Sequence, residues 1–157
     1  MVAEPDNARL VVDFLNSIDI DEGIDLLAEA ASYRRWAVAH GLRARNRQQA
    51  VILRDALRQL VHTGDATLPD ITLTARVGSD GTPQLVGTDV AAAVLAAAVR
   101  LTTQDQWRRL KLCPNPVCLE AFWDRSKNRS RTWCDMNGCG NLAKTRAYRT
   151  RRRTSHR

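Results

Sequence analysis

Four cysteines in two equally spaced pairs constrain this chain more than any other feature. Cys113 and Cys118 are followed by Cys134 and Cys139 in the pattern C-x4-C-x15-C-x4-C. Both four-residue intervals are rich in Pro, Asn, Asp and Gly, which favour tight turns. Two cysteines on one turn can offer two sulfurs to a zinc ion, and a second pair completes the tetrahedron. The spacing therefore predicts one zinc ion, with buried free thiols or two disulfides as the alternatives.

The ligand set predicts a structural metal and not a catalytic one. Four thiolates fill the tetrahedron and leave no position for water. A deaminase-type zinc site needs His or Cys followed two residues later by Glu, and none of His40, His62 and His156 fits. The sequence also contains no phosphate-cradling glycine loop and no nucleophile-base pair that spacing can identify. We expect one structural Zn2+, no other cofactor, no catalytic residue and no enzyme activity.

The chain shows no signal for export or for a membrane. Met1 to Asn7 contains two acidic residues and lacks the basic start and apolar run of a signal peptide. The longest apolar stretch, Val90 to Val99, is about half of a bilayer span. We expect a cytoplasmic protein without a membrane partner, where four thiols favour metal over disulfides. The 21 Arg against 3 Lys, with abundant Ala, are typical of a GC-rich bacterial genome.

Apolar periodicity predicts a mainly α fold of the α+β class, a helical N-terminal body with one small hairpin. The expected helices cover residues 6–17, about 19–40, 46–62 and 90–101. Alternating apolar residues at 71–77, a turn at 78–81 and a return strand at 84–86 predict a half-buried β-hairpin packed on the helices. We place a domain boundary after residue 103, between a body of residues 1–103 and a zinc module of residues 104–157.

The zinc module is expected to end in a basic helix over residues 140–153. A helix N-terminus favours a nearby thiolate, so the metal would fix the direction of this helix. Few core residues are available to the module beyond Phe122, Trp123 and Trp133. A structural zinc contributes on the order of 10 kcal/mol to the folding of small fingers, which would compensate for so small a core.

Charge is divided very unevenly along the chain. Residues 104–157 carry 14 basic and 4 acidic residues, a net of +10, whereas residues 1–103 carry a net of −3. A basic arm on an acidic body suggests a polyanionic partner, DNA in the first place. The candidate contacts in the loop between the cysteine pairs are Arg125, Lys127, Arg129 and Arg131. Those in the final helix are Lys144, Arg146, Arg149, Arg151, Arg152 and Arg153.

Other interpretations of these cations remain open. They could bind RNA, or they could form a solvated surface without a partner. Trp123 and Trp133 could stack on single-stranded bases, although packing beside the zinc is the better prediction. The thiolates could also form a redox-sensing or protein-interaction module that releases zinc when they are oxidised.

Four stretches of the module resemble the CGNR zinc finger: Cys113 to Cys118, Phe122 to Ser126, Arg131 to Met136 and Cys139 to Asn141. Proteins of that family join this finger to an N-terminal ABATE domain and are described as stress-induced transcription regulators. The helical segment, with Asp13 to Ser17 near its start, resembles that domain. The resemblance implies a zinc-binding transcription regulator with a sensor domain that could bind a small-molecule effector. A homodimer is expected if the operator is two-fold symmetric.

Two positions depart from the family pattern. Leu142 stands where the family has its name-giving arginine, and Thr132 stands where a second arginine usually precedes the tryptophan. If these arginines touch DNA in relatives, this chain lacks both contacts. The metal ligands are unaffected.

Overall fold

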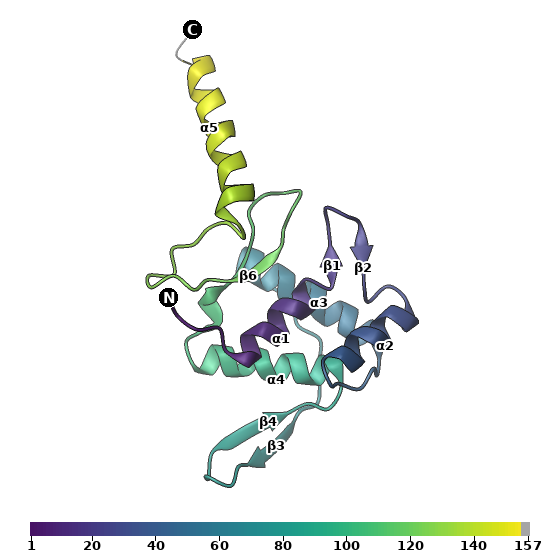
Figure 1. Cartoon of the computed structure of the whole chain (residues 1–157). Coiled ribbons are helices and arrows are strands. Elements are labelled where there is room, and N and C mark those ends of the chain that lie inside the picture. Colours follow the sequence, from purple (N-terminus) through teal and green to yellow (C-terminus); the bar gives the residue numbers. More distant parts are fainter. Residues whose placement is uncertain (155–157) are drawn as a thin grey trace.

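The computed structural model describes residues 1–154, without the side chains of Thr150, Arg153 and Thr154. Its centre consists of three mutually contacting helices, α1 (Asp6–Leu15), α3 (Arg47–Thr63) and α4 (Val90–Thr103), and α2 (Ala30–Ala39) covers one end (Figure 1). Three two-stranded sheets and a C-terminal helix, α5 (Asn141–Thr154), complete the chain. The α+β class with a helical body is confirmed.

The central helix α4 begins where the sequence predicts. The Asp89 carboxylate accepts a hydrogen bond from the backbone N–H of Ala92 at 3.1 Å and caps the helix. Small and branched apolar side chains follow, and Val90, Val94 and Leu101 are fully buried. Among the described residues, no helix is both long and apolar enough to cross a membrane.

Helix α3 also begins and ends close to the predicted residues. The Asn46 side chain accepts a hydrogen bond from the Gln49 backbone N–H at 3.2 Å. At the other end, Gly64 adopts a left-handed conformation with φ of 80°, which a glycine adopts without strain. The buried face of this helix includes Ala50, Leu53 and Leu57.

The predicted helix over residues 19–40 is wrong in its first half. Residues 18–25 form a hairpin of two short strands, β1 (Ile18–Asp19) and β2 (Ile24–Asp25), and α2 begins only at Ala30. The Asp19 carboxylate accepts hydrogen bonds from the backbone N–H groups of Asp21 and Glu22, at 3.0 and 3.1 Å. Acidic residues that resemble a helix start therefore close a turn instead.

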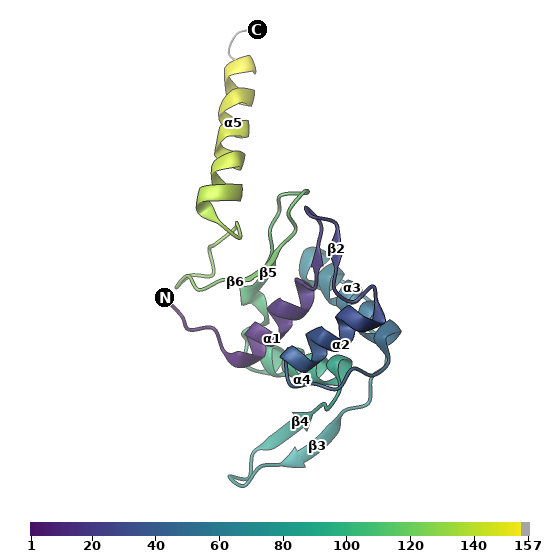
Figure 2. The ribbon, with the colours of Figure 1, turned by 45° about the vertical axis from the view of Figure 1, so that its right-hand side comes forward.

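The second hairpin exists as predicted, but it is not half-buried. Strands β3 (Thr74–Val77) and β4 (Pro83–Val86) pair antiparallel, and every residue of β3 is exposed, Val77 to 76%. Figures 1 and 2 both show the hairpin projecting from the helical body. A hydrogen bond joins the hairpin to the body: the Arg100 guanidinium of α4 donates to the Leu85 carbonyl of β4 at 2.7 Å.

A third strand pair, which the sequence did not predict, joins the cysteine-bearing segment to the helical core. Strands β5 (Leu110–Leu112) and β6 (Ala121–Trp123) are antiparallel, and Leu110, Ala121 and Trp123 belong to the same core as α1, α3 and α4. The Asn16 amide pairs with Ala121 like a neighbouring strand, donating to its carbonyl at 2.9 Å and accepting from its N–H at 2.7 Å. The core is therefore continuous across residue 103.

A buried arginine fastens the first hairpin to α3. Arg54 is 2% exposed, and its guanidinium donates to both carboxylate oxygens of Asp25, at 2.6 and 3.0 Å. Burial by itself would raise the pKa of Asp25, but the hydrogen bonds from Arg54 and Leu27 and the charge of Arg54 lower it. Without Asp25, the buried guanidinium would keep the bond from its Nε to Asp55, at 3.0 Å, but would lose the bidentate partner that compensates most of its lost hydration.

Substitution of Asp25 by Ala is expected to lower the free energy of unfolding by about 3 kcal/mol, because it leaves the buried Arg54 guanidinium without its bidentate partner. The matched control is Asp21→Ala on the exposed turn of the same hairpin, expected to change stability by less than about 0.5 kcal/mol. Denaturant unfolding measures both. Equal effects of the two substitutions would contradict this account of Arg54.

Candidate metal centre and basic helix

The four cysteine sulfurs meet at one point of the structure. Their Sγ atoms all lie within 4.8 Å of one another, and the Sγ atoms of Cys118 and Cys134 are 3.6 Å apart. Two sulfurs on a tetrahedral zinc with Zn–S bonds of about 2.3 Å are separated by about 3.8 Å. Cys113 is fully buried and the other three are half-buried. The donor set and its spacing fit one structural zinc ion.

Each cysteine pair lies on a turn that the intervening residues build. In the first, the Asn115 carbonyl accepts hydrogen bonds from the backbone N–H groups of Cys118 and Leu119, at 2.9 and 3.1 Å. In the second, the Asp135 carboxylate accepts from Asn137 N–H at 3.1 Å and Gly138 N–H at 2.7 Å. This second turn is η2 (Met136–Gly140), a π-helical turn that leads directly into α5.

One residue beside the cluster supports a ligand without being one. The Asn115 side chain is 6% exposed, and its amide Nδ2 donates to the Cys139 Sγ at 3.3 Å. An N–H donor stabilises a thiolate and orients it toward the metal. The sequence identified Asn115 only as part of a turn, because nothing along the chain shows which sulfur an amide will reach.

Three thiols of the cluster differ in the direction in which their pKa values are shifted. Burial raises the pKa of the Cys118 thiol to about 11 and also raises that of Cys134. At Cys113 burial acts in the same direction, but hydrogen bonds from the backbone of Cys134 and Asn115 outweigh it, and the pKa is lowered. Zinc binds thiolates, so it must displace the remaining protons, and its affinity rises with pH until they are lost.

A buried carboxylate organises the loop between the cysteine pairs, residues 124–131, which we call the basic loop. Asp124 is 0% exposed and accepts hydrogen bonds from Lys111 Nζ at 2.7 Å, Ser126 N–H at 2.8 Å and Arg131 N–H at 2.9 Å. Burial opposes ionisation, but the hydrogen bonds from Lys111 and Ser126 lower the pKa of Asp124 to about 2. Lys111 also donates to the carbonyls of Arg129 and Arg131.

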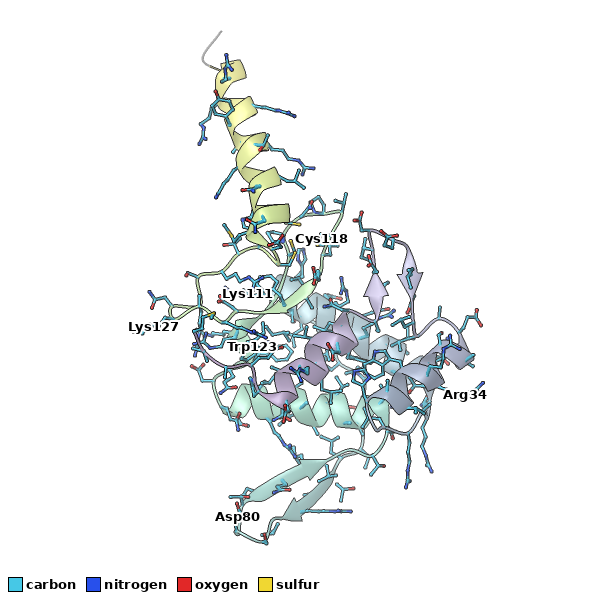
Figure 3. All side chains as sticks on the ribbon, viewed as in Figure 1. Arg34, Asp80, Lys111, Cys118, Trp123 and Lys127 are labelled. Carbon is cyan, nitrogen blue, oxygen red and sulfur yellow. The ribbon has the colours of Figure 1, made fainter. Side chains whose placement is uncertain are left out.

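Three of the four predicted loop cations make contacts within the protein. Arg125 pairs with Glu4 at 2.6 Å, and Arg129 pairs with Asp105 at 2.8 Å. Arg131 donates to the carbonyls of Trp133 and Cys134, and its guanidinium lies 4.9 Å from the centre of the Phe122 ring. Lys127 makes none of the ion pairs found in the described residues and extends outward in Figure 3.

The basic helix α5 projects from the zinc-binding turn, away from the helical body (Figures 1 and 2). It begins one residue after the predicted start, and its main contact is with η2. Five of the six predicted helix cations are exposed: Lys144, Arg146, Arg149, Arg151 and Arg152. The Arg153 side chain lies outside the described residues.

The chain is expected to contain one zinc per molecule and to lose it when Cys134 is replaced by Ser. Asn115→Ala should weaken zinc binding about ten-fold, because the Cys139 thiolate loses its amide donor. Asn137→Ala, in the other turn, is the matched control, since only its backbone supports the site. Competition with a chromophoric chelator measures the affinities. Equal affinity of the two asparagine variants would contradict the role of Asn115.

The pKa of Asp124 gives a pH dependence with a defined sign. Because the pKa is lowered on folding, the carboxylate stabilises the folded state above its unfolded pKa of about 3.9, by about 2.6 kcal/mol. This contribution declines as the pH falls through the folded value of about 2. The stability difference between the native protein and Asp124→Asn should therefore be constant from pH 7 to 5 and about half as large at pH 3. Denaturant unfolding at each pH measures it, and a difference that stays constant to pH 3 would contradict it.

Two protein-family models match the chain in sequence. The CGNR zinc finger model matches residues 109–152, which include the four cysteines and most of α5. The ABATE model, described as "Putative stress-induced transcription regulator", matches residues 8–107, with most of α1 and all of α2, α3 and α4. No curated protein matches the chain. The resemblance drawn from the sequence is confirmed: the chain belongs to the ABATE family and carries a CGNR zinc finger.

Proposed function

We propose that this protein is a DNA-binding transcription regulator of the bacterial cytoplasm, stabilised by zinc and without enzyme activity. The observation that carries the proposal is α5, an exposed helix that a metal-bound turn holds away from the body. Its 14 residues include six cations and no acidic residue. A surface of this kind is the electrostatic footprint expected of a protein that binds nucleic acid.

The dimensions of α5 suit the major groove of duplex DNA. A helix of 14 residues is about 21 Å long and about 10 to 12 Å wide with its side chains. The major groove is about 12 Å wide and admits one helix. Cations on all sides of α5 would contact phosphates on both walls of the groove.

The helix gains little stability from the rest of the protein. Leu142 and Tyr148 are 52% and 55% exposed, so no apolar face is packed against the body. An isolated helix of this length is marginal in water, and neighbouring like charges weaken it further. DNA would neutralise these charges and favour the helical state. The zinc-bound turn at its N-terminus would keep the helix directed at the groove before binding.

Three exposed cations are the DNA contacts that best fit the proposal. Lys144 and Arg149 are exposed on α5, and Lys127 is the loop cation without an ion pair among those described. Leu142 replaces the family arginine on the first turn of α5. DNA contact by this chain would therefore depend on the flanking cations, and its site preference would differ from that of relatives with the arginine.

The double substitution Lys144→Gln with Arg149→Gln should weaken binding to duplex DNA at least ten-fold. Two lost phosphate contacts would reduce the slope of log K against log salt by about 1.8. The matched control is Arg34→Gln with Arg35→Gln on the exposed surface of α2, which changes the net charge equally. Fluorescence anisotropy with labelled duplex measures both. No binding at low salt, or an equal loss in the control, would refute the proposal.

The same binding assay can identify the type of nucleic acid that is bound and the oligomeric state of the bound protein. Competition between duplex DNA and structured RNA distinguishes the two polyanions, and selection from a random DNA pool identifies a preferred site. A two-fold symmetric site would imply a homodimer, which the mass of the complex would reveal.

A second candidate function is a thiolate switch that oxidation opens. Cys118, Cys134 and Cys139 are half-buried, and the sulfurs of Cys118 and Cys134 are close enough to form a disulfide after local adjustment. Hydrogen peroxide would take two electrons from this pair, form the disulfide and release zinc, and would itself become water. Zinc release under mild peroxide supports this function, and full retention of zinc opposes it.

A further inference from the structure

An apolar pocket of about 290 Å3 opens between α3 and α4. Its walls include Leu57 and Leu60 of α3, Leu68 of the following connection and Leu95 of α4. The deepest parts are buried, since Leu57 is 1% and Ala98 is 5% exposed. The pocket opens to solvent at a rim that includes the exposed Thr102 and Thr103, so its apolar walls are accessible to a ligand.

The pocket walls carry no charged side chain and few hydrogen-bonding groups. These groups are the indole N–H of Trp107 and the hydroxyls of Thr102 and Thr103, which donate to the backbone carbonyls of Ala98 and Arg100, each at 3.0 Å. A charged molecule would lose hydration there without compensation. The chemistry of the walls therefore selects a neutral, apolar ligand.

The size of the pocket limits the ligand further. The volume equals that of roughly ten water molecules at about 30 Å3 each, at the lower end for small-molecule sites. A compound of one or two fused or linked rings fits this volume. A partner helix, about 10 Å across, would lie on the opening without entering it.

One residue of the pocket connects it to the basic loop. Trp107 lines the pocket and begins the turn η1 (Trp107–Arg109). Two residues after it, Arg109 donates to the carbonyls of Asp124 and Ser126, at 2.9 and 2.8 Å. Two residues before it, Asp105 forms the ion pair with Arg129. A shift of Trp107 would therefore displace Arg109 and Asp105, which both bind the loop.

We propose that this pocket binds a neutral, apolar small molecule, and that its occupancy is coupled through Trp107 to the conformation of residues 124–131. A ligand can shift the loop only if it binds one arrangement of Trp107 better than another. The inference concerns the helical body, and its test requires no DNA, so it stands or fails independently of DNA binding.

The probe for the test is N-phenyl-1-naphthylamine, a neutral compound that becomes fluorescent in apolar surroundings. The zinc-loaded full chain should bind it saturably, with one site per molecule. Val99→Trp places an indole in the pocket and should weaken binding at least ten-fold, whereas Val38→Trp, on the exposed surface of α2, should leave it unchanged. Thr102→Trp fills the pocket from its exposed rim and replaces Val99→Trp if thermal unfolding shows that variant to be unfolded.

Each outcome decides the proposal. Binding that does not saturate, or that survives a pocket-filling substitution in a folded variant, would overturn the site. Loss of binding in Val38→Trp would assign the probe to the surface of α2 and would also overturn it. Hydrogen exchange of the backbone amides of residues 124–131 tests the coupling. Saturating probe should change their exchange rates at least two-fold, and unchanged rates would overturn the coupling.

Discussion

The bonds from four cysteine sulfurs to one zinc ion determine where the last helix, α5, lies relative to the rest of the protein. Cys113 follows a strand of the main core, whereas Cys139 lies in the turn that begins α5. The helix itself has only minor packing against the body, so the metal is the main link between the two. Loss of zinc would leave one buried and three half-buried thiols close together, with no apolar core beneath the helix to hold its direction.

The cations of the finger divide into two groups with different physical roles. Those of the basic loop mostly bind carboxylates, carbonyls and an aromatic ring within the protein, and the ion pair of the buried Asp124 with Lys111 supports the loop. The described cations of α5 are exposed, on a helix whose sequence contains no acidic residue. The first group gives the finger its shape, and the second supplies the charge on which the proposed DNA binding depends.

The helical body and the finger are matched by separate family models, but they contact each other directly in the structure. Asn16, at the end of α1, pairs with Ala121 of β6, and Arg58 of α3 bridges the carbonyls of Leu15 and Leu119. Together with Trp107, these contacts provide routes along which a change in the body would reach the finger. A regulatory ligand in the body would therefore not need a separate mobile linker to influence the basic loop.

The sequence by itself determined the metal site, the class of the fold, the approximate bounds of α3 and α4 and the basic helix. These features depend on local spacing: two cysteines on a turn, an Asp or Asn before a helix, a glycine after one. Only the tertiary structure decided that residues 18–25 turn instead of continuing a helix, because the Asp25 carboxylate is needed by Arg54, 29 residues away. It also decided which cations find partners within the protein, since a salt bridge such as Arg125 with Glu4 joins residues 121 positions apart. Periodicity and composition describe neighbours along the chain, whereas partners of this kind become neighbours only when the core has formed.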